Sequence, residues 1–198
     1  SGALVLALCC LIATLSSLDR VMMSVAMLPM SAEFGWADAT KGLVAASFTT
    51  GYFACLVPAG VAAAMLSPSR PLTVGLVAWS AAQAATPAAA YAGLAPLLAC
   101  RALMGAGESC TFPSIQAIAA RWVPERFRSR FFGCLAAAFN LGTIAAYAVS
   151  PALIARAGWP GTFAVYGAIG VGLAALWAAV GRDAPARPEQ CVPDSCDV

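Results

Sequence analysis

The segment 93–120 reads GLAPLLACRALMGAGESCTFPSIQAIAA, and Arg101 and Glu108 are its only charged residues. The run is longer than the roughly 20 mostly apolar residues that an α-helix needs to cross the hydrocarbon core of a bilayer. Glycine, alanine and serine recur along it, which favours close packing against other helices inside a membrane. The segment therefore predicts a transmembrane helix that carries two charges.

The rest of the chain has the same apolar character. Of its 198 residues, 61% are hydrophobic and 10% are charged, against about 25% charged residues in an ordinary soluble domain. This composition excludes a soluble enzyme and a nucleic-acid-binding protein. The sequence also lacks histidine, which removes His-based catalysis and His-ligated metal sites. We predict an all-α integral membrane protein that is not an enzyme and that uses no metal and no other cofactor.

Six segments are long and apolar enough to be transmembrane helices, and they make one predicted domain over residues 1–181. Turn-forming or charged residues separate them, with the least marked turn near Tyr91–Gly93. Residues 182–198 are rich in proline and acidic residues and look like a cytoplasmic linker or tail. The predicted spans are 3–30, 41–64, 71–90, 93–120, 130–154 and 160–181.

The basic residues between the spans predict the orientation of the chain. Alternate breaks carry seven arginines, whereas the opposite breaks carry Lys41 and Arg156. Because positively charged loops stay in the cytoplasm, we expect both ends of this multi-pass segment to be cytoplasmic. The seven arginines are Arg70, Arg121, Arg126, Arg128, Arg130, Arg182 and Arg187.

Four ionisable residues lie inside predicted spans: Asp19 and Arg20 in the first, Arg101 and Glu108 in the fourth. Each charge at the bilayer centre costs at least about 2.5–3.5 kcal/mol on insertion scales. Their charges sum to zero, so one interpretation is a salt bridge that holds the first and fourth spans together. The other interpretation is a functional site inside the membrane.

Helix geometry favours the functional interpretation. Arg101 and Glu108 are two turns apart on one helix face, separated by about 10 Å of rise. Two arginines that face a shared cavity would suit a carboxylate or phosphate, because guanidinium pairs with both in bidentate fashion. Glu108 could exchange a proton beside them, as a coupled anion carrier requires. Asp19 is expected to be the charge partner of an arginine.

The stretch RALMGAGESCTFP at 101–113, with the loop arginines that follow it, resembles the fourth helix and following loop of the anion:cation symporters of the major facilitator superfamily. DRVMMSVA at 19–26 is similar to the family's arginine-containing first helix, and FGW at 34–36 precedes the second span. Gly51 and Tyr52 match within that span. The resemblance extends from about residue 15 to residue 181.

The resemblance implies the N-terminal half of a twelve-helix transporter, whose two six-helix halves hold the substrate between them and exchange it by rocking. By the same resemblance, Arg20 and Arg101 would contact a small anion, and Glu108 would take part in H⁺ or Na⁺ coupling. Tyr52 and Asn140 are further candidates for the substrate pocket. A C-terminal six-helix half is the expected partner.

Three features depart from the family pattern. The loop after the second span lacks the Asp-Arg core of the wider superfamily's signature, and only Gly60 and Arg70 stand at the expected places. Phe127 stands where the loop after the fourth span usually has glutamate, which puts the usual cytoplasmic gate in doubt. Ala45 stands where vesicular glutamate carriers have histidine, so glutamate specificity of that type is not supported. Six spans cannot form a two-sided cavity alone. The alternative is therefore a truncated, non-transporting membrane protein that modulates or assembles with a partner, although the lack of an initial Met suggests an excerpt from a longer protein.

Overall fold

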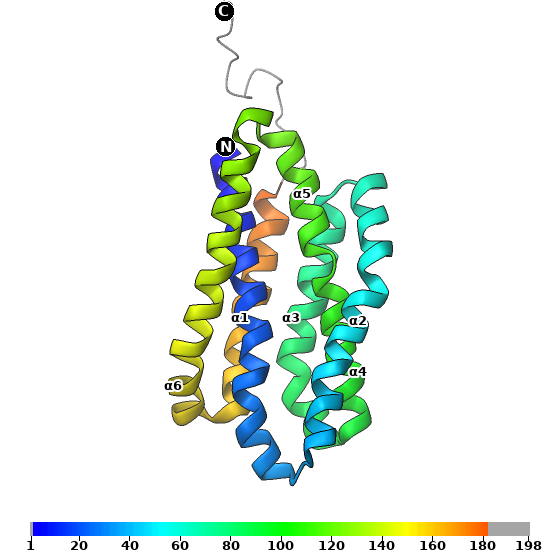
Figure 1. The fold of residues 1–198 in the computed structure, drawn as a ribbon, viewed down its shortest axis with the longest axis vertical. Coiled ribbons are helices and arrows are strands. Elements are labelled where there is room, and N and C mark those ends of the chain that lie inside the picture. The colour runs from blue at the N-terminus through cyan, green and yellow to red at the C-terminus, as the bar shows by residue number, and fades with distance from the viewer. Residues whose placement is uncertain (1, 182–198) are drawn as a thin grey trace, which may run out of the picture.

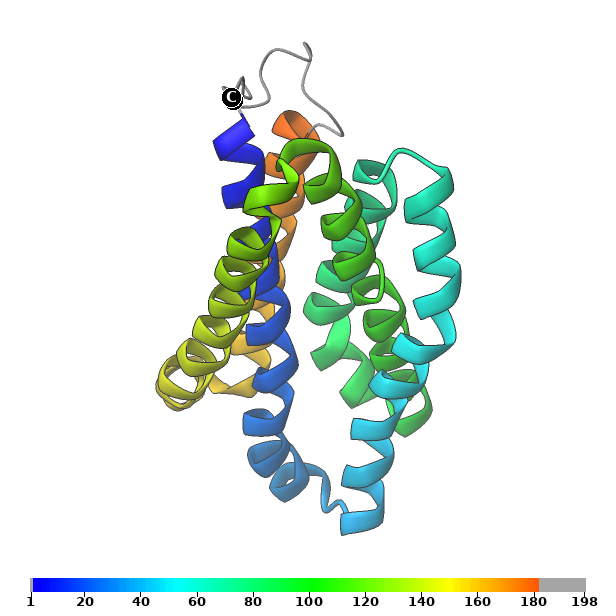
Figure 2. The same cartoon turned by 45° about the horizontal axis from the view of Figure 1, so that its top comes forward.

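The computed structural model describes residues 2–181, which form helices joined by short turns and contain no strand. Figure 1 and the turned view of Figure 2 show the helices standing side by side as a bundle. The predicted tail, 182–198, lies outside the described residues. The helices are α1 (Gly2–Phe34), α2 (Asp38–Met65), α3 (Ser69–Ala92), α4 (Leu94–Glu108), α5 (Thr111–Trp122) and α6 (Glu125–Val180).

Helix α6 contains two of the predicted spans. Its continuity is broken at Gly158, whose backbone angles are φ 70° and ψ 169°. Glycine takes this positive φ without the steric cost that a side chain brings. The chain therefore reverses there, and Figure 1 shows the yellow-green part of α6 descending the bundle and the orange part returning.

The fourth predicted span is divided into α4 and α5 by a turn at Ser109 and Cys110. Pro113 explains the position of the break, because a proline ring clashes with the carbonyl group four residues earlier, here that of Ser109. Helix α4 therefore ends at Glu108. This places the acidic residue at the end of a helix, close to the middle of the bundle.

The sequence prediction of an all-α, six-span bundle is confirmed. Three of the described helices, α1, α2 and α6, are long and apolar enough to cross a membrane by themselves. Helix α6 supplies two crossings because it turns at Gly158, and α4 with α5 covers the fourth predicted span. Helix α3 ends at Ala92, and Gly93 turns the chain with a φ of 128°.

Helices α2 and α4 approach each other closely at glycines. A Cβ added to Gly105 would collide with the backbone carbonyl oxygen of Phe48 and lie 2.9 Å from the backbone nitrogen of Tyr52. A Cβ added to Gly51 would collide with the backbone of Ala102. These contacts fix the aromatic residues of α2 beside the charged face of α4, where the candidate site lies.

We expect Gly105→Ala to destabilise the protein, because the added methyl group meets backbone rather than a movable side chain. Overpacking of this kind costs about 1–3 kcal/mol. The measurement is the apparent melting temperature of the purified protein in detergent. Gly133→Ala is the control, since a Cβ there meets no atom within 4 Å. Equal melting temperatures for the two variants would contradict the close packing of α2 and α4.

Candidate functional site

The centre of the site is an ion pair between α1 and α4. The Nη2 atom of Arg20 donates to Oε1 of Glu108 at 2.9 Å. The Ser16 hydroxyl donates to the same oxygen, from one turn earlier on α1. Glu108 is 1% exposed, and its second oxygen has no partner among the described residues. The salt bridge between the first and fourth spans therefore exists, and it joins Arg20 to Glu108.

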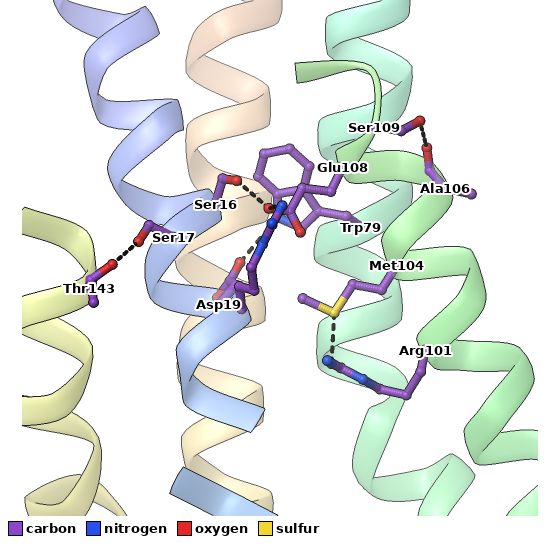
Figure 3. Close-up of polar contacts among 11 residues, drawn as sticks. Ser16, Ser17, Asp19, Trp79, Arg101, Met104, Ala106, Glu108, Ser109 and Thr143 are labelled. Carbon is purple, nitrogen blue, oxygen red and sulfur yellow. Dashed lines mark hydrogen bonds and ion pairs between the residues drawn. The ribbon is translucent and has the colours of Figure 1, made fainter. Parts of the chain in front are cut away.

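Arg101 lies on the same face of α4, and its environment differs from that of Arg20. It is 2% exposed, yet no described carboxylate forms an ion pair with it. Its Nη1 atom donates to the Met104 sulfur at 3.0 Å, and its Nε atom has no partner in the described part of the chain. A thioether is a weak acceptor. Figure 3 shows Arg101 and Glu108 both reaching from α4 toward α1.

Two aromatic residues of α2 lie beside the guanidinium groups. The Phe48 ring centroid is 5.2 Å from Cζ of Arg20 and 5.4 Å from Cζ of Arg101, so one ring contacts both cations. The Tyr52 ring lies 5.1 Å from Cζ of Arg20. Cation–π attraction of this kind contributes about 0.5–2 kcal/mol, more where water is excluded. The Tyr52 ring therefore contacts Arg20, and its part in binding a substrate stays a prediction.

A pocket of about 210 Å³ opens between α1, α2 and α4 beside these groups. Both arginines contribute to its wall, with hydroxyl groups from α1 and α2 and two methionine side chains. Methionine is flexible and adapts to ligands of different shape. The lining residues are Arg20, Met23, Ser24, Met27, Ala45, Phe48, Thr49 and Arg101.

Asp19 forms its hydrogen bonds with residues of α3. Its oxygens accept hydrogen bonds from Nε1 of Trp79 at 3.1 Å and from Nε2 of Gln83 at 3.2 Å. Asp19 is 1% exposed and takes part in none of the ion pairs between described residues. Asp19 therefore forms no ion pair with a described arginine, and its role as the counter-ion of one stays a prediction, since its charge still attracts that of Arg101. Its neighbour on the helix, Arg20, binds Glu108 of α4.

Asn140 is not brought to the pocket. Its side chain is exposed on α6, and its amide donates to the carbonyl oxygen of Ala136, one turn earlier, at 2.8 Å. Sequence reasoning placed it in the site and did not propose Phe48 as a contact of both arginines. The sequence pattern that could have indicated Phe48 is its position four residues before Tyr52, which puts both rings on one helix face.

The geometry provides two unequal cations. Arg20 is 38% exposed at its side chain and is neutralised by Glu108, whereas Arg101 is buried and forms no ion pair with a described residue. Burying an unpaired charge is costly, so an anion that enters the pocket would supply the missing partner. The anion would also compete with Glu108 for Arg20, so binding of the anion would change the contacts of Glu108. The site therefore has the chemistry to bind a carboxylate or phosphate.

Comparison with known proteins agrees with the fold. The family pattern described as Major Facilitator Superfamily matches residues 9–193. A crystal structure of a bacterial homologue of the human lysosomal transporter Spinster, inward-facing and unoccupied, superposes with a TM-score of 0.85 at 22% identity. The match covers 93% of this chain and 44% of that one, so the chain has the fold of about half of such a transporter.

Plant proteins are more similar in sequence. The "Sodium-dependent phosphate transport protein 1, chloroplastic" of Arabidopsis thaliana is 39% identical over 180 residues, which is 91% of this chain and 35% of that protein. The "Probable anion transporter 4, chloroplastic" of Oryza sativa subsp. japonica is 41% identical over 92% of this chain and 31% of its own length. The "Ascorbate transporter, chloroplastic" of Arabidopsis is 39% identical over 82% of this chain. The chain spans about a third of the length of these relatives.

Proposed function

Because the chain belongs to the Major Facilitator Superfamily, we propose that it is the N-terminal half of a secondary transporter that carries a small organic or inorganic anion. The observation that supports this most strongly is Arg101, a buried cation in the wall of a pocket, with no described anionic partner. A site that keeps such a group gains binding free energy only when an anion arrives.

The two arginines have different roles in this proposal. Arg101 holds the carboxylate or phosphate through its planar donor pattern, and the Phe48 ring keeps both guanidinium groups facing the pocket. Arg20 exchanges partners, leaving Glu108 when it binds the anion. Glu108 is then free to take up a proton or to attract Na⁺, so the movement of anion and cation is coupled.

Alternating access requires a second wall. In this superfamily the two halves of a transporter rock about a site near the bilayer midplane, so we propose that a C-terminal six-helix half completes the pocket. Both ends of the segment would lie in the cytoplasm by the distribution of arginines. The names of the plant relatives supply three anion classes to test: phosphate, ascorbate and other small anions.

The test is uptake by a complete carrier that contains this chain, reconstituted in liposomes. Radiolabelled phosphate, ascorbate and a small dicarboxylate are offered under an H⁺ gradient, a Na⁺ gradient or neither. We expect at least one anion to accumulate under one of the gradients and excess unlabelled anion to prevent it. The Arabidopsis phosphate protein serves as the positive control. Accumulation by that control, with none by this carrier under any gradient, would contradict the proposal.

A further inference from the structure

A second pocket lies between the start of α3 and the end of α6. Its volume is about 460 Å³, and no residue of its wall also lines the arginine pocket. Figure 1 shows that these helix ends lie at the end of the bundle that carries the N-terminus. The positive-inside rule assigns that end to the cytoplasm. The lining residues are Ser69, Arg70, Thr73, Val74, Trp177, Ala178 and Gly181.

The positive charge of this pocket is uncompensated. Arg70 is exposed at its rim and forms no ion pair with any other described residue. Helix α3 begins at Ser69, so the positive end of its dipole lies at the same place. Both features favour a negatively charged ligand.

A buried donor adds an independent indication of a ligand. Trp177 lines the pocket and is 1% exposed, and its indole Nε1 atom has no hydrogen-bond partner in the described part of the chain. A buried N–H group without an acceptor costs free energy. An oxygen atom brought by a ligand would satisfy it. Arg70 forms no ion pair and the Trp177 indole has no acceptor among the described residues, and donors of this kind bind phosphate oxygens.

Apart from Ser69 and Thr73, the rest of the pocket wall is apolar. Val74, Ala178 and the Trp177 ring provide hydrocarbon surface. The Val74 side chain is 69% exposed, so this surface is open to lipid. A free phosphate ion would leave this surface bare, whereas a lipid carries a phosphate and acyl chains together. We propose that the pocket binds an anionic phospholipid of the cytoplasmic leaflet, with its phosphate at Arg70 and Trp177 and its acyl chain along Val74.

Native mass spectrometry of the purified chain tests this site. The protein is mixed with phosphatidylglycerol or phosphatidylcholine of identical acyl chains, and the retained lipid is counted. We expect preferential retention of phosphatidylglycerol, weakened roughly fivefold by Arg70→Gln, since one cation near an anionic surface contributes on that order. Arg121→Gln is the matched control, because Arg121 is also exposed at this end but does not line the pocket. Trp177→Phe removes only the N–H donor and should reduce the retention of phosphatidylglycerol less than Arg70→Gln does.

Three results would overturn the proposal. Equal weakening by Arg70→Gln and Arg121→Gln would mean that the lipid responds to the total charge of this end. Equal retention of the two lipids by the unchanged protein would show that the pocket does not select an anionic headgroup. Displacement of phosphatidylglycerol by millimolar inorganic phosphate would mean that the site takes free phosphate. Arg70 is exposed, so its replacement leaves the packed core intact and the comparison remains valid.

Discussion

Replacing Arg101 with methionine is expected to abolish anion uptake while leaving the protein as stable to heat as before, or more stable. Losing one partner of a buried charge pair costs about 2–5 kcal/mol of binding free energy, so we expect affinity to fall roughly thirtyfold or more. Stability should respond in the opposite direction. Arg101 is buried without an anionic partner among the described residues, and replacing such buried charges by apolar side chains is often neutral or stabilising.

Two measurements on one variant separate the roles of Arg101. Uptake of the transported anion by the complete carrier reports binding, and the apparent melting temperature in detergent reports stability. Arg156→Met is the control, because Arg156 is exposed on α6 and lies outside the pocket. A large drop in melting temperature for Arg101→Met would identify a structural arginine. Unchanged uptake would remove Arg101 from the site.

Replacing Glu108 with glutamine is expected to separate coupling from binding. Glutamine keeps the shape of the side chain but cannot neutralise Arg20, whose Nη2 atom now contacts Oε1 of Glu108 at 2.9 Å. Arg20 would then be permanently available to the anion. Gradient-driven accumulation should fall roughly a hundredfold or more, the scale on which a positioned proton-transfer group acts. Exchange of anion across the membrane without a gradient should persist.

Ser16→Ala is the matched control for this comparison. Ser16 donates to the same Glu108 oxygen as Arg20 does, but its loss leaves both charges in place. Removing one hydrogen bond to a charged group costs about 1.5–3 kcal/mol. This loss should make the position of the Glu108 carboxylate less fixed without ending coupling. If Glu108→Gln still accumulates anion as fast as the unchanged carrier, Glu108 is only a structural partner of Arg20.

The local features of the fold could be predicted from the sequence because they depend on short-range patterns. Apolar runs of bilayer length gave the helices, and the turn at Gly93 lies where turn residues interrupt an otherwise apolar stretch. Helical periodicity placed Arg101 and Glu108 on one face of the fourth span, and both are buried on α4. None of these features depends on which helices pack against one another.

The partners of the charged residues could not be predicted in the same way, because they depend on how the helices are rotated against one another. Asp19 and Arg20 are adjacent on α1 and point to different neighbours, Asp19 to Trp79 of α3 and Arg20 to Glu108 of α4. One signal was available. Trp79 and Gln83 are four residues apart, so they share a helix face, and a glutamine in an apolar span needs a polar partner.

Arg20 and Arg101 are proposed to make a pocket that attracts anions, and the reactivity of a cysteine placed in that pocket tests this proposal. Ser24 is exposed and lines the pocket, so Ser24→Cys places a thiol beside both arginines. The eight native cysteines are first replaced by alanine. The rates of modification by a negatively and a positively charged methanethiosulfonate of similar size are then compared. This measurement needs only the chain described above.

We predict that the anionic reagent reacts roughly tenfold faster or more relative to the cationic one, because charges that line a cleft raise the local concentration of oppositely charged molecules by 10-fold to 10³-fold. Adding Arg101→Gln should remove most of this preference. Equal rates for the two reagents, or a faster cationic reagent, would contradict the assignment of this pocket as an anion site.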